Sequence, residues 1–460
     1  MSAGSEVLRD ASRLARTLEQ RVRGERILLR GALSPTWAVA FFGLALAGAR
    51  VVPVARGAAV PELEHFASDT GARFAIDTDA PGARVLDRLE SLDVGALEAF
   101  EPAFVARALE RIDPSDPLLV VYTSGTTGLP KGAVLSHANL AAQTSILREA
   151  WAMDGRDTLL HALPMHHVHG VTVAFLTAFT AGAGVLHLDR FDAATALAAM
   201  RDATVFMAVP TMWSRLVEAI EASPDPGLAD GLRALRLFTS GSAALPASLA
   251  ERVRAIAGAI PLERYGMTEI GMALSNPLDP RARRVGTVGT PLPTVEARIV
   301  DEQGERIEDA ARPGALEIRG PSVFSGYWGR PSEGDFHDGW FVTGDVAQRD
   351  ADGFVRLLGR ASVDILKTGG EKVSALELEE MLREHPGIAE VAVIGVPDER
   401  WGDRVVAVVV AVAGAGGELS ADEVRAFAKA RVAPYKVPKE VRFVDELPRN
   451  AMGKVQKGRL

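Results

Sequence analysis

The chain of 460 residues contains no cysteine. This absence excludes disulfide bonds, thiolate metal sites and a cysteine nucleophile. It is also typical of proteins from a reducing compartment, where disulfides do not form.

Positive charge does not predominate, because 51 Lys and Arg stand against 60 Asp and Glu and give a net charge of −9. The balance argues against a general nucleic-acid partner or an anionic membrane surface, although it allows a local anion site. Hydrophobic residues make up 47% and charged residues 24% of the chain. This composition is that of a globular protein, and the length predicts more than one structural unit.

No apolar run is long enough to cross a bilayer, which takes about 20 residues. The run at 37–49 is too short, and the run at 170–186 is interrupted by Gly182 and Gly184. We expect both runs to lie in buried helices. Residues 1–16 mix charges and lack the apolar core of a secretory signal, so we expect a cytoplasmic protein without a membrane span.

Short apolar runs alternate with helical patterns up to about residue 290, which is typical of α/β proteins with parallel sheets. Short strands with turn signals follow, and a last region of about 95 residues mixes strands and helices. We therefore predict an α/β fold with a large N-terminal domain (1–360) of doubly wound sheets and a β-rich subdomain. A small mobile α+β domain (361–460) is expected to follow. Strands are predicted at 26–30, 51–54, 118–122, 158–163, 185–188, 205–209, 235–239, 295–300, 315–319, 354–358, 391–395 and 405–412, and helices at 375–384 and 421–431.

A loop rich in glycine and hydroxyl residues follows the predicted strand at 118–122 directly. Backbone N–H groups and hydroxyls of such a loop can hold a polyphosphate, and a lysine adds positive charge. The spacing is not that of a Walker A loop. The phosphate-binding candidates are Thr123, Ser124, Gly125, Thr126, Thr127, Gly128 and Lys131.

Ten consecutive residues of this loop, 123–132, resemble the phosphate loop of the adenylate-forming superfamily. Members of this superfamily include acyl-CoA synthetases, which activate a carboxylate with ATP to an acyl adenylate and transfer the acyl group to coenzyme A. The resemblance implies ATP, Mg²⁺ and coenzyme A as cofactors, and small molecules as the binding partners.

Further motifs occur in the order of that family. The resemblance implies that Tyr265 stacks on adenine, that Thr268 contacts the phosphate, and that Glu269 helps to hold Mg²⁺, with Thr127 as a second metal ligand. The carboxylate of Asp345 would accept hydrogen bonds from the ribose, which suits an acceptor-only side chain. The other residues implied to bind ATP or AMP are Gly241, Ser242, Ala243, Gly266, Met267 and Arg360.

The C-terminal motifs imply a domain that rotates between two half-reactions. Lys454 matches the catalytic lysine of adenylate formation, where an ammonium stabilises charge growing on the α-phosphoryl group. Ser362 occupies the hinge position, where the family usually has Asp or Lys. Thr368, Gly369 and Gly370 match the loop that lines the tunnel for the CoA thiol.

The local sequence around 263–289 and 362–379 most resembles the malonyl-CoA synthetase branch. A second carboxylate on the substrate needs a buried cation, preferably a guanidinium. Arg283 is the expected partner, because it stands where the branch places such an arginine, and Arg284 is the alternative. His167 of the gate motif, which is also implied to be catalytic, or Ser240 could assist. A zinc site at the three histidines of 166–169 is rejected, because no further ligands have metal spacing.

Two other functions remain possible from the sequence. One is an acyl-CoA synthetase for a short monocarboxylic acid, such as acetate or propionate. The other is a non-catalytic nucleotide-binding relative.

Overall fold

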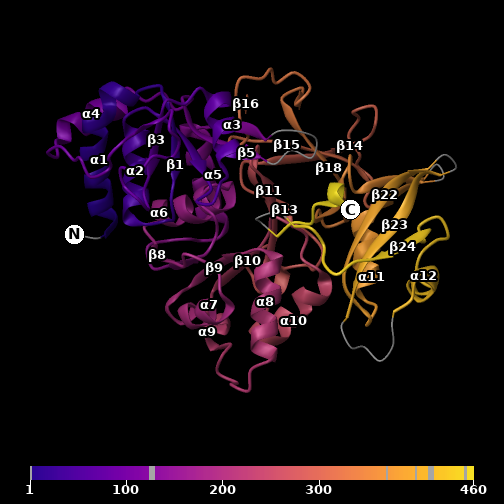
Figure 1. The fold of residues 1–460 in the computed structure, drawn as a ribbon. Coiled ribbons are helices and arrows are strands. Elements are labelled where there is room, and N and C mark those ends of the chain that lie inside the picture. Colours follow the sequence, from indigo (N-terminus) through magenta and orange to yellow (C-terminus); the bar gives the residue numbers. More distant parts are fainter. Residues whose placement is uncertain (1–2, 124–129, 369–370, 399–400, 413–418, 450–452) are drawn as a thin grey trace.

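The structure is a computed structural model that describes residues 3–123, 130–368, 371–398, 401–412, 419–449 and 453–460. Figure 1 shows a large body, coloured from indigo to orange, beside a smaller body of orange and yellow elements. No described helix is long and apolar enough to cross a membrane.

The first sheet of the large body is mostly parallel. In the described residues its strand order is β16-β6-β5-β2-β1-β3-β4, antiparallel only at β6 and β16. The central residues of β5 are buried on both faces, as its apolar run predicts. The strands are β1 (Arg26–Arg30), β2 (Arg50–Val54), β3 (Phe74–Asp77), β4 (Glu90–Ser91), β5 (Pro117–Thr123), β6 (Lys131–Ser136) and β16 (Gly326–Tyr327).

Helices pack around this sheet (Figure 1). Ser34 begins α2 by accepting a hydrogen bond from the backbone N–H of Trp37, and Pro35 fits the first turn because a free N–H is not needed there. The helices are α1 (Ala3–Val22), α2 (Pro35–Leu46), α3 (Val60–Thr70), α4 (Pro102–Glu110) and α5 (His137–Ala150).

The second sheet follows the same scheme, with the order β13-β12-β11-β10-β9-β7-β8 in the described residues. It is parallel from β8 to β11 and antiparallel beyond. The strands are β7 (Thr158–His161), β8 (Gly184–His187), β9 (Val205–Ala208), β10 (Leu237–Ser240), β11 (Leu262–Met267), β12 (Gly271–Ser275) and β13 (Thr290–Pro291). Its helices are η1 (His169–Leu176), α6 (Thr177–Thr180), α7 (Ala193–Ala199), η2 (Met200–Asp202), α8 (Pro210–Glu221), α9 (Asp230–Ala234), α10 (Ala247–Ala257) and η3 (Pro280–Ala282).

The β-rich unit is an antiparallel sheet in which β18 pairs with β15, β17 and β19. Its strands are β14 (Glu296–Val300), β15 (Gly314–Arg319), β17 (Phe336–His337), β18 (Trp340–Arg349) and β19 (Val355–Arg360).

The small body is a further sheet with its own apolar core, which α11 and α12 help to form. Its elements are β20 (Ile365–Thr368), β21 (Glu371–Ser374), α11 (Ala375–Arg383), β22 (Ile388–Asp398), β23 (Gly402–Ala411), α12 (Ala421–Lys429), β24 (Glu440–Phe443) and η4 (Lys457–Arg459).

The predicted fold class is confirmed, and the predicted strands lie within a few residues of the observed ones. The run at 170–186 differs from its prediction. It forms η1, a buried π-helix, and then α6, but its last residues form strand β8. The change of direction occurs at Gly182, whose φ of +72° is unfavourable for other residues.

Candidate active site

The phosphate loop joins two antiparallel strands of the first sheet. Thr123 ends β5 and Lys131 begins β6. The predicted phosphate-binding residues Ser124, Gly125, Thr126, Thr127 and Gly128 lie outside the described residues. The ammonium nitrogen of Lys131 lies 5.1 Å from the ring centroid of Tyr327, on β16. This contact places the lysine at the edge of the first sheet, beside the tyrosine whose hydroxyl binds Glu269.

Glu269 lies in the turn between β11 and β12 and is 4% exposed. Its Oε1 accepts a 2.8 Å hydrogen bond from the hydroxyl of Tyr327. Burial raises the pKa of Glu269, and the hydrogen bond from Tyr327 opposes the rise. A buried carboxylate of this kind suits a divalent cation, which would offset the cost of its charge.

The motif 265–269 runs from strand β11 into this turn. Gly266 must be glycine, because a Cβ there would lie 2.1 Å from the carbonyl oxygen of Gly271 on the neighbouring strand. Met267 and Thr268 are half-buried beside it. The motif therefore holds one side chain on the strand, Tyr265, and one in the turn, Glu269.

Asp345 joins Tyr265 to Arg360. Its Oδ2 accepts a 2.5 Å hydrogen bond from the Tyr265 hydroxyl, and its Oδ1 lies 3.1 Å from Nε of Arg360. Burial raises the pKa of Asp345, while Arg360, Tyr265 and the charge of Lys454 oppose the rise. The three predicted nucleotide-binding residues are thus in contact, on β11, β18 and β19.

Lys454 belongs to the C-terminal segment but acts on the large body, as its effect on Asp345 indicates. The preceding Gly453 has φ +76°, and a Cβ there would lie 2.7 Å from Oγ1 of Thr211 on α8. A second contact between the two bodies is a 2.8 Å hydrogen bond from the backbone N–H of Ala247 to the carboxylate of Glu380. It satisfies the first turn of α10, which has no side-chain cap of its own.

Ser362, the predicted hinge, is exposed in the turn between β19 and β20. Thr368 ends β20, and its buried hydroxyl has no hydrogen-bond partner in the described part of the chain. Gly369 and Gly370, the rest of the predicted tunnel loop, lie outside the described residues.

A fully buried arginine, Arg264, lies on β11 next to the loop that follows β10. Its Nη2 contacts Nε2 of His169. A Cβ at Gly241 would lie 1.7 Å from Nη1 of Arg264, so the guanidinium rests directly on that backbone. Among the described residues, no carboxylate pairs with Arg264, and its Nε has no hydrogen-bond partner.

The tautomer of His169 follows from this contact. A guanidinium can only donate, so Nε2 of His169 accepts and its Nδ1 carries the proton. Nδ1 lies 3.2 Å from Oγ of Ser242 and donates to it. Burial keeps the pKa of His169 well below its usual value, with Arg264 adding to the effect. The ring is therefore neutral and does not repel the cation beside it.

Two hydroxyls near this cation are also unsatisfied. Thr239 and Ser240 end β10 directly before Gly241, and in the described residues their buried side-chain oxygens have no hydrogen-bond partners. Burial lowers the pKa of Arg264 to about 9, so the group is charged at pH 7. An unpaired buried cation beside free hydroxyls forms a site for an anion. Sequence reasoning missed Arg264, although it precedes Tyr265 in the recognised motif.

Arg283, the residue first expected to bind a carboxylate, is used differently. It is buried, and its guanidinium donates to the backbone carbonyls of Ile260, Pro277 and Leu278. Arg284 pairs with Asp350 and Asp352 at the surface. Several donors of Arg283 and Arg284 therefore have acceptors nearby. In the described residues, Arg264 contacts the neutral ring of His169, and its Nε has no hydrogen-bond partner.

The gate histidines lie side by side, with ring centroids of His166 and His167 4.1 Å apart. Burial lowers the pKa of His167 to about 4 and that of His166 to about 3. Both rings are thus neutral at pH 7. No group of three metal-ligating side chains is present among the described residues.

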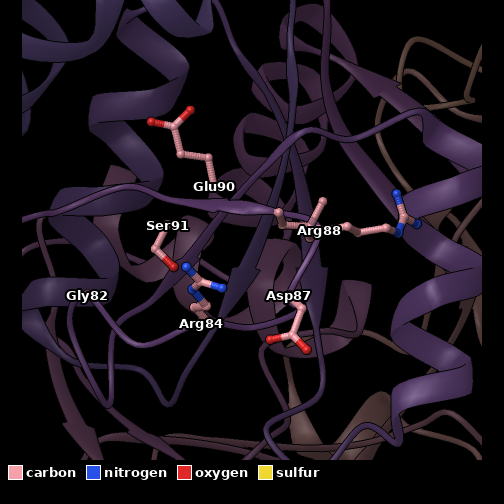
Figure 2. Close-up of a pocket in the computed structure, with 7 residues that line it drawn as sticks. Gly82, Arg84, Asp87, Arg88, Glu90 and Ser91 are labelled. Carbon is pink, nitrogen blue, oxygen red and sulfur yellow. The ribbon is translucent and has the colours of Figure 1, made fainter.

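The surface hollow drawn in Figure 2 is separate from these residues. It lies at β4, on the outer edge of the first sheet, and Figure 2 shows its labelled side chains pointing in different directions rather than converging. Arg88, one of them, already pairs with Glu64. We therefore place the functional site at the motif residues.

The buried acid Glu263 precedes Arg264 in the chain and is expected to make the stability of the protein depend on pH. Burial raises the pKa of Glu263 to about 8, against hydrogen bonds from the backbone N–H groups of Gly286 and Leu245. The folded state thus keeps a proton that the unfolded state loses near pH 4.5. Stability therefore falls as pH rises between these values, by up to about 1.4 kcal/mol per pH unit from this group.

Glu263→Gln is expected to gain stability relative to the wild type as pH rises from 5.5 to 7.5, because glutamine has no proton to lose. Urea unfolding at both pH values measures the difference. Glu251→Gln, which changes an exposed carboxyl on α10, is the control. Equal pH slopes for Glu263→Gln and the wild type would contradict the prediction.

The model for AMP-binding enzymes matches residues 4–328, and the model for their C-terminal domain matches 377–454. The chain belongs to the AMP-binding enzyme family. This family assignment agrees with the contacts among Tyr265, Asp345 and Arg360.

Curated relatives in the family include proteins named malonate–CoA ligase ACSF3, mitochondrial. The bovine protein is 40% identical over 95% of this chain and 81% of its own length. The mouse protein is 47% identical over 74% of this chain, and the match covers 64% of the mouse protein.

Solved structures in the family are similar along nearly the whole chain. ATP-bound MatB from Rhodopseudomonas palustris is 34% identical with a TM-score of 0.86, covering 99% of this chain and 92% of MatB. A malonyl-CoA ligase complex with methylmalonyl-CoA and AMP is 38% identical with a TM-score of 0.69, covering 96% and 94%. The predicted superfamily and branch are thereby confirmed.

Proposed function

We propose that this protein ligates malonate, or a close dicarboxylic acid such as methylmalonate, to coenzyme A. A carboxylate oxygen of the acid attacks the α-phosphorus of ATP, and the bond to pyrophosphate breaks. The CoA thiol then attacks the acyl carbonyl and AMP leaves. The observation that carries the proposal is Arg264, a buried cation without a carboxylate partner in the described residues.

The relatives support this substrate class, because they are named malonate–CoA ligases. A diacid keeps one carboxylate after the other is activated, and that charge needs a partner inside the pocket. We assign this partner to Arg264 instead of Arg283, whose donors are already bound to backbone carbonyls. By strand register, Thr239 of β10 shares the sheet face of Arg264, so its hydroxyl can donate a further hydrogen bond to the same carboxylate, whereas Ser240 lies on the opposite face.

The nucleotide residues fit ATP and Mg²⁺. Glu269 and Thr127 would hold the metal, which neutralises charge between the phosphates as pyrophosphate leaves. Asp345 offers acceptors to the ribose, and Arg360 opposes the rise that burial causes in the pKa of that carboxyl. Lys131 and Lys454 place positive charge at the phosphates and at the transferring group. Tyr327 fixes the orientation of Glu269 through its hydroxyl.

The second half-reaction requires a different arrangement of the small domain. In this structure Lys454 reaches the large domain, so we assign the observed arrangement of the two domains to adenylate formation. Rotation about Ser362 would withdraw Lys454 and bring Thr368, Gly369 and Gly370 to the thiol. We place the domain boundary at residues 360 and 361, between Arg360 and the hinge.

A screen of acids for pyrophosphate release tests the function. With ATP, Mg²⁺ and CoA, malonate is expected to give the highest kcat/KM, ahead of acetate and propionate by roughly 100-fold or more, because the monoacids leave Arg264 unpaired. Detection of malonyl-CoA and AMP as products completes the assay. A preference for a monoacid would instead identify a short-chain acyl-CoA synthetase. ATP binding without turnover of any acid would identify a non-catalytic relative.

A cytoplasmic location stays a prediction for this chain. Several of its animal relatives are named as mitochondrial proteins. Fractionation of cells that express the protein distinguishes the two compartments.

A further inference from the structure

A second lysine of the C-terminal segment, Lys457, is buried with two carboxylates. Its ammonium nitrogen lies 2.6 Å from Oδ1 of Asp364 and 2.7 Å from Oε1 of Glu379. The three side chains are only 10%, 13% and 5% exposed, respectively. Such a group is costly to bury and sensitive to geometry, so it fixes the positions of the segments that carry it.

Asp364 connects this group to the hinge. Its Oδ2 accepts a 3.0 Å hydrogen bond from the backbone N–H of Arg360, and its own N–H donates to the carbonyl of Arg360. These two hydrogen bonds join the first and last residues of the turn at 360–364. The carboxylate that closes it is the one that binds Lys457.

Hydrogen bonds fix the chain on both sides of Lys454. Arg449 pairs with Val455 as an isolated bridge, and its guanidinium donates to the carbonyl of Gly453 and to Glu390 on β22. The N–H of Gln456 donates to the carbonyl of Pro448. Lys457 is the next residue, so its ion pairs fix the exit of the loop to α11 and to the hinge.

We infer that Lys457 is a positioning residue for Lys454. It anchors the loop to Asp364 and Glu379, so that Lys454 meets the transferring phosphoryl group in the adenylation arrangement. This role rests on the proposed adenylate-forming function. Displacement of a catalytic charge by about 1 Å can cost as much as 100-fold in rate, which makes the anchor consequential.

The two carboxylates favour the charged form of Lys457. Burial alone lowers the pKa of Lys457, but Glu379 and Asp364 outweigh it and raise the pKa above its usual value. Glu379 is itself fixed, because its Oε1 also accepts from the N–H of Val393 on β22. The lysine of the anchor is therefore charged at neutral pH.

The test compares Lys457→Met with the wild type in each half-reaction. ATP–pyrophosphate exchange measures adenylation, and supplied malonyl-adenylate with CoA measures thioester formation. We expect the kcat of exchange to fall about 10- to 100-fold with the KM for ATP changed less than about twofold, and thioester formation to keep its rate. Lys457→Arg, which keeps the charge, is expected to recover part of the exchange rate.

Two further proteins separate positioning from loss of folding. Lys457→Met leaves two carboxylates without their cation, so Glu379→Gln/Lys457→Met restores the original net charge of the group and is expected to show the same exchange defect. Lys436→Met removes a different lysine that pairs with α11, at Glu377, and is expected to leave both half-reactions unchanged.

Hydrogen exchange of the backbone amides gives a readout that does not depend on the acid. Lys457→Met is expected to speed exchange at 453–457 and at 360–364, while the core of β22 and β23 keeps its protection. Unchanged exchange in these segments would overturn the anchor. Equal losses in both half-reactions would overturn the positioning role, whereas a wild type that turns over no acid would overturn the proposed function and leave the amide measurement to decide the anchor.

Discussion

Lys454→Ala is expected to abolish adenylate formation and to spare thioester formation. The ammonium of Lys454 already acts on Asp345 in this structure, so it reaches the carboxylate proposed to bind the ribose of ATP. Loss of such a preorganised charge costs roughly 10²–10³-fold in kcat. ATP–pyrophosphate exchange with malonate measures this step.

The second half-reaction is the internal control for Lys454→Ala. In the proposed mechanism, domain rotation withdraws Lys454 before the thioester forms. The rate of thioester formation from supplied malonyl-adenylate is therefore expected to change less than about threefold. Lys429→Ala, at an exposed position on α12, controls for the loss of a C-terminal lysine charge. Equal losses in both half-reactions would refute the role given to Lys454.

The α/β fold was predictable because many of its strands are short apolar runs that alternate with helical patterns. The five residues of β5 between Leu118 and Tyr122 are buried on both faces, as a central strand requires. The π-helix at His169–Leu176 was not predictable, since its composition equally suits an α-helix. Its geometry depends on packing inside the large body, where all eight residues are buried.

The nucleotide residues were predictable as a set because short motifs fix their spacing. Tyr265, Asp345 and Arg360 come from three separate motifs and meet in the structure. Tyr327 was missed, because a tyrosine outside any motif gives no signal until Glu269 is seen beside it.

The residue proposed to bind the acid could be found only in the structure. Arg264 and Arg283 look alike in the sequence, and the expectation favoured Arg283. The guanidinium of Arg283 donates to three backbone carbonyls. Which groups surround a guanidinium depends on chain segments that lie far apart in the sequence, so the motif alone does not reveal them. In a chain with net charge −9, the proposed anion sites therefore depend on a few cations whose local partners leave them available.

Arg264→Met is expected to remove the preference for malonate. Without the guanidinium, the free carboxylate of malonate would be buried unpaired, which costs about 3–5 kcal/mol, or roughly 10²–10⁴-fold in kcat/KM. Acetate and propionate lose no partner, so their kcat/KM is expected to stay within about threefold of the wild type. Pyrophosphate release with each acid measures the change.

Arg283→Met is the matched control and is expected to behave in the opposite way. It takes this donor away from one buried and two half-buried backbone carbonyls, so the free energy of unfolding falls by about 1–3 kcal/mol while the preference for malonate remains. Arg264→Met instead removes a buried charge that has no carboxylate partner in the described residues, so its stability is expected to equal or exceed that of the wild type. Loss of malonate preference in Arg283→Met, with retention in Arg264→Met, would return the carboxylate-binding role to Arg283. Uniform loss for all acids in Arg264→Met would exclude a role in specificity, because a residue that binds only the second carboxylate cannot affect a monoacid.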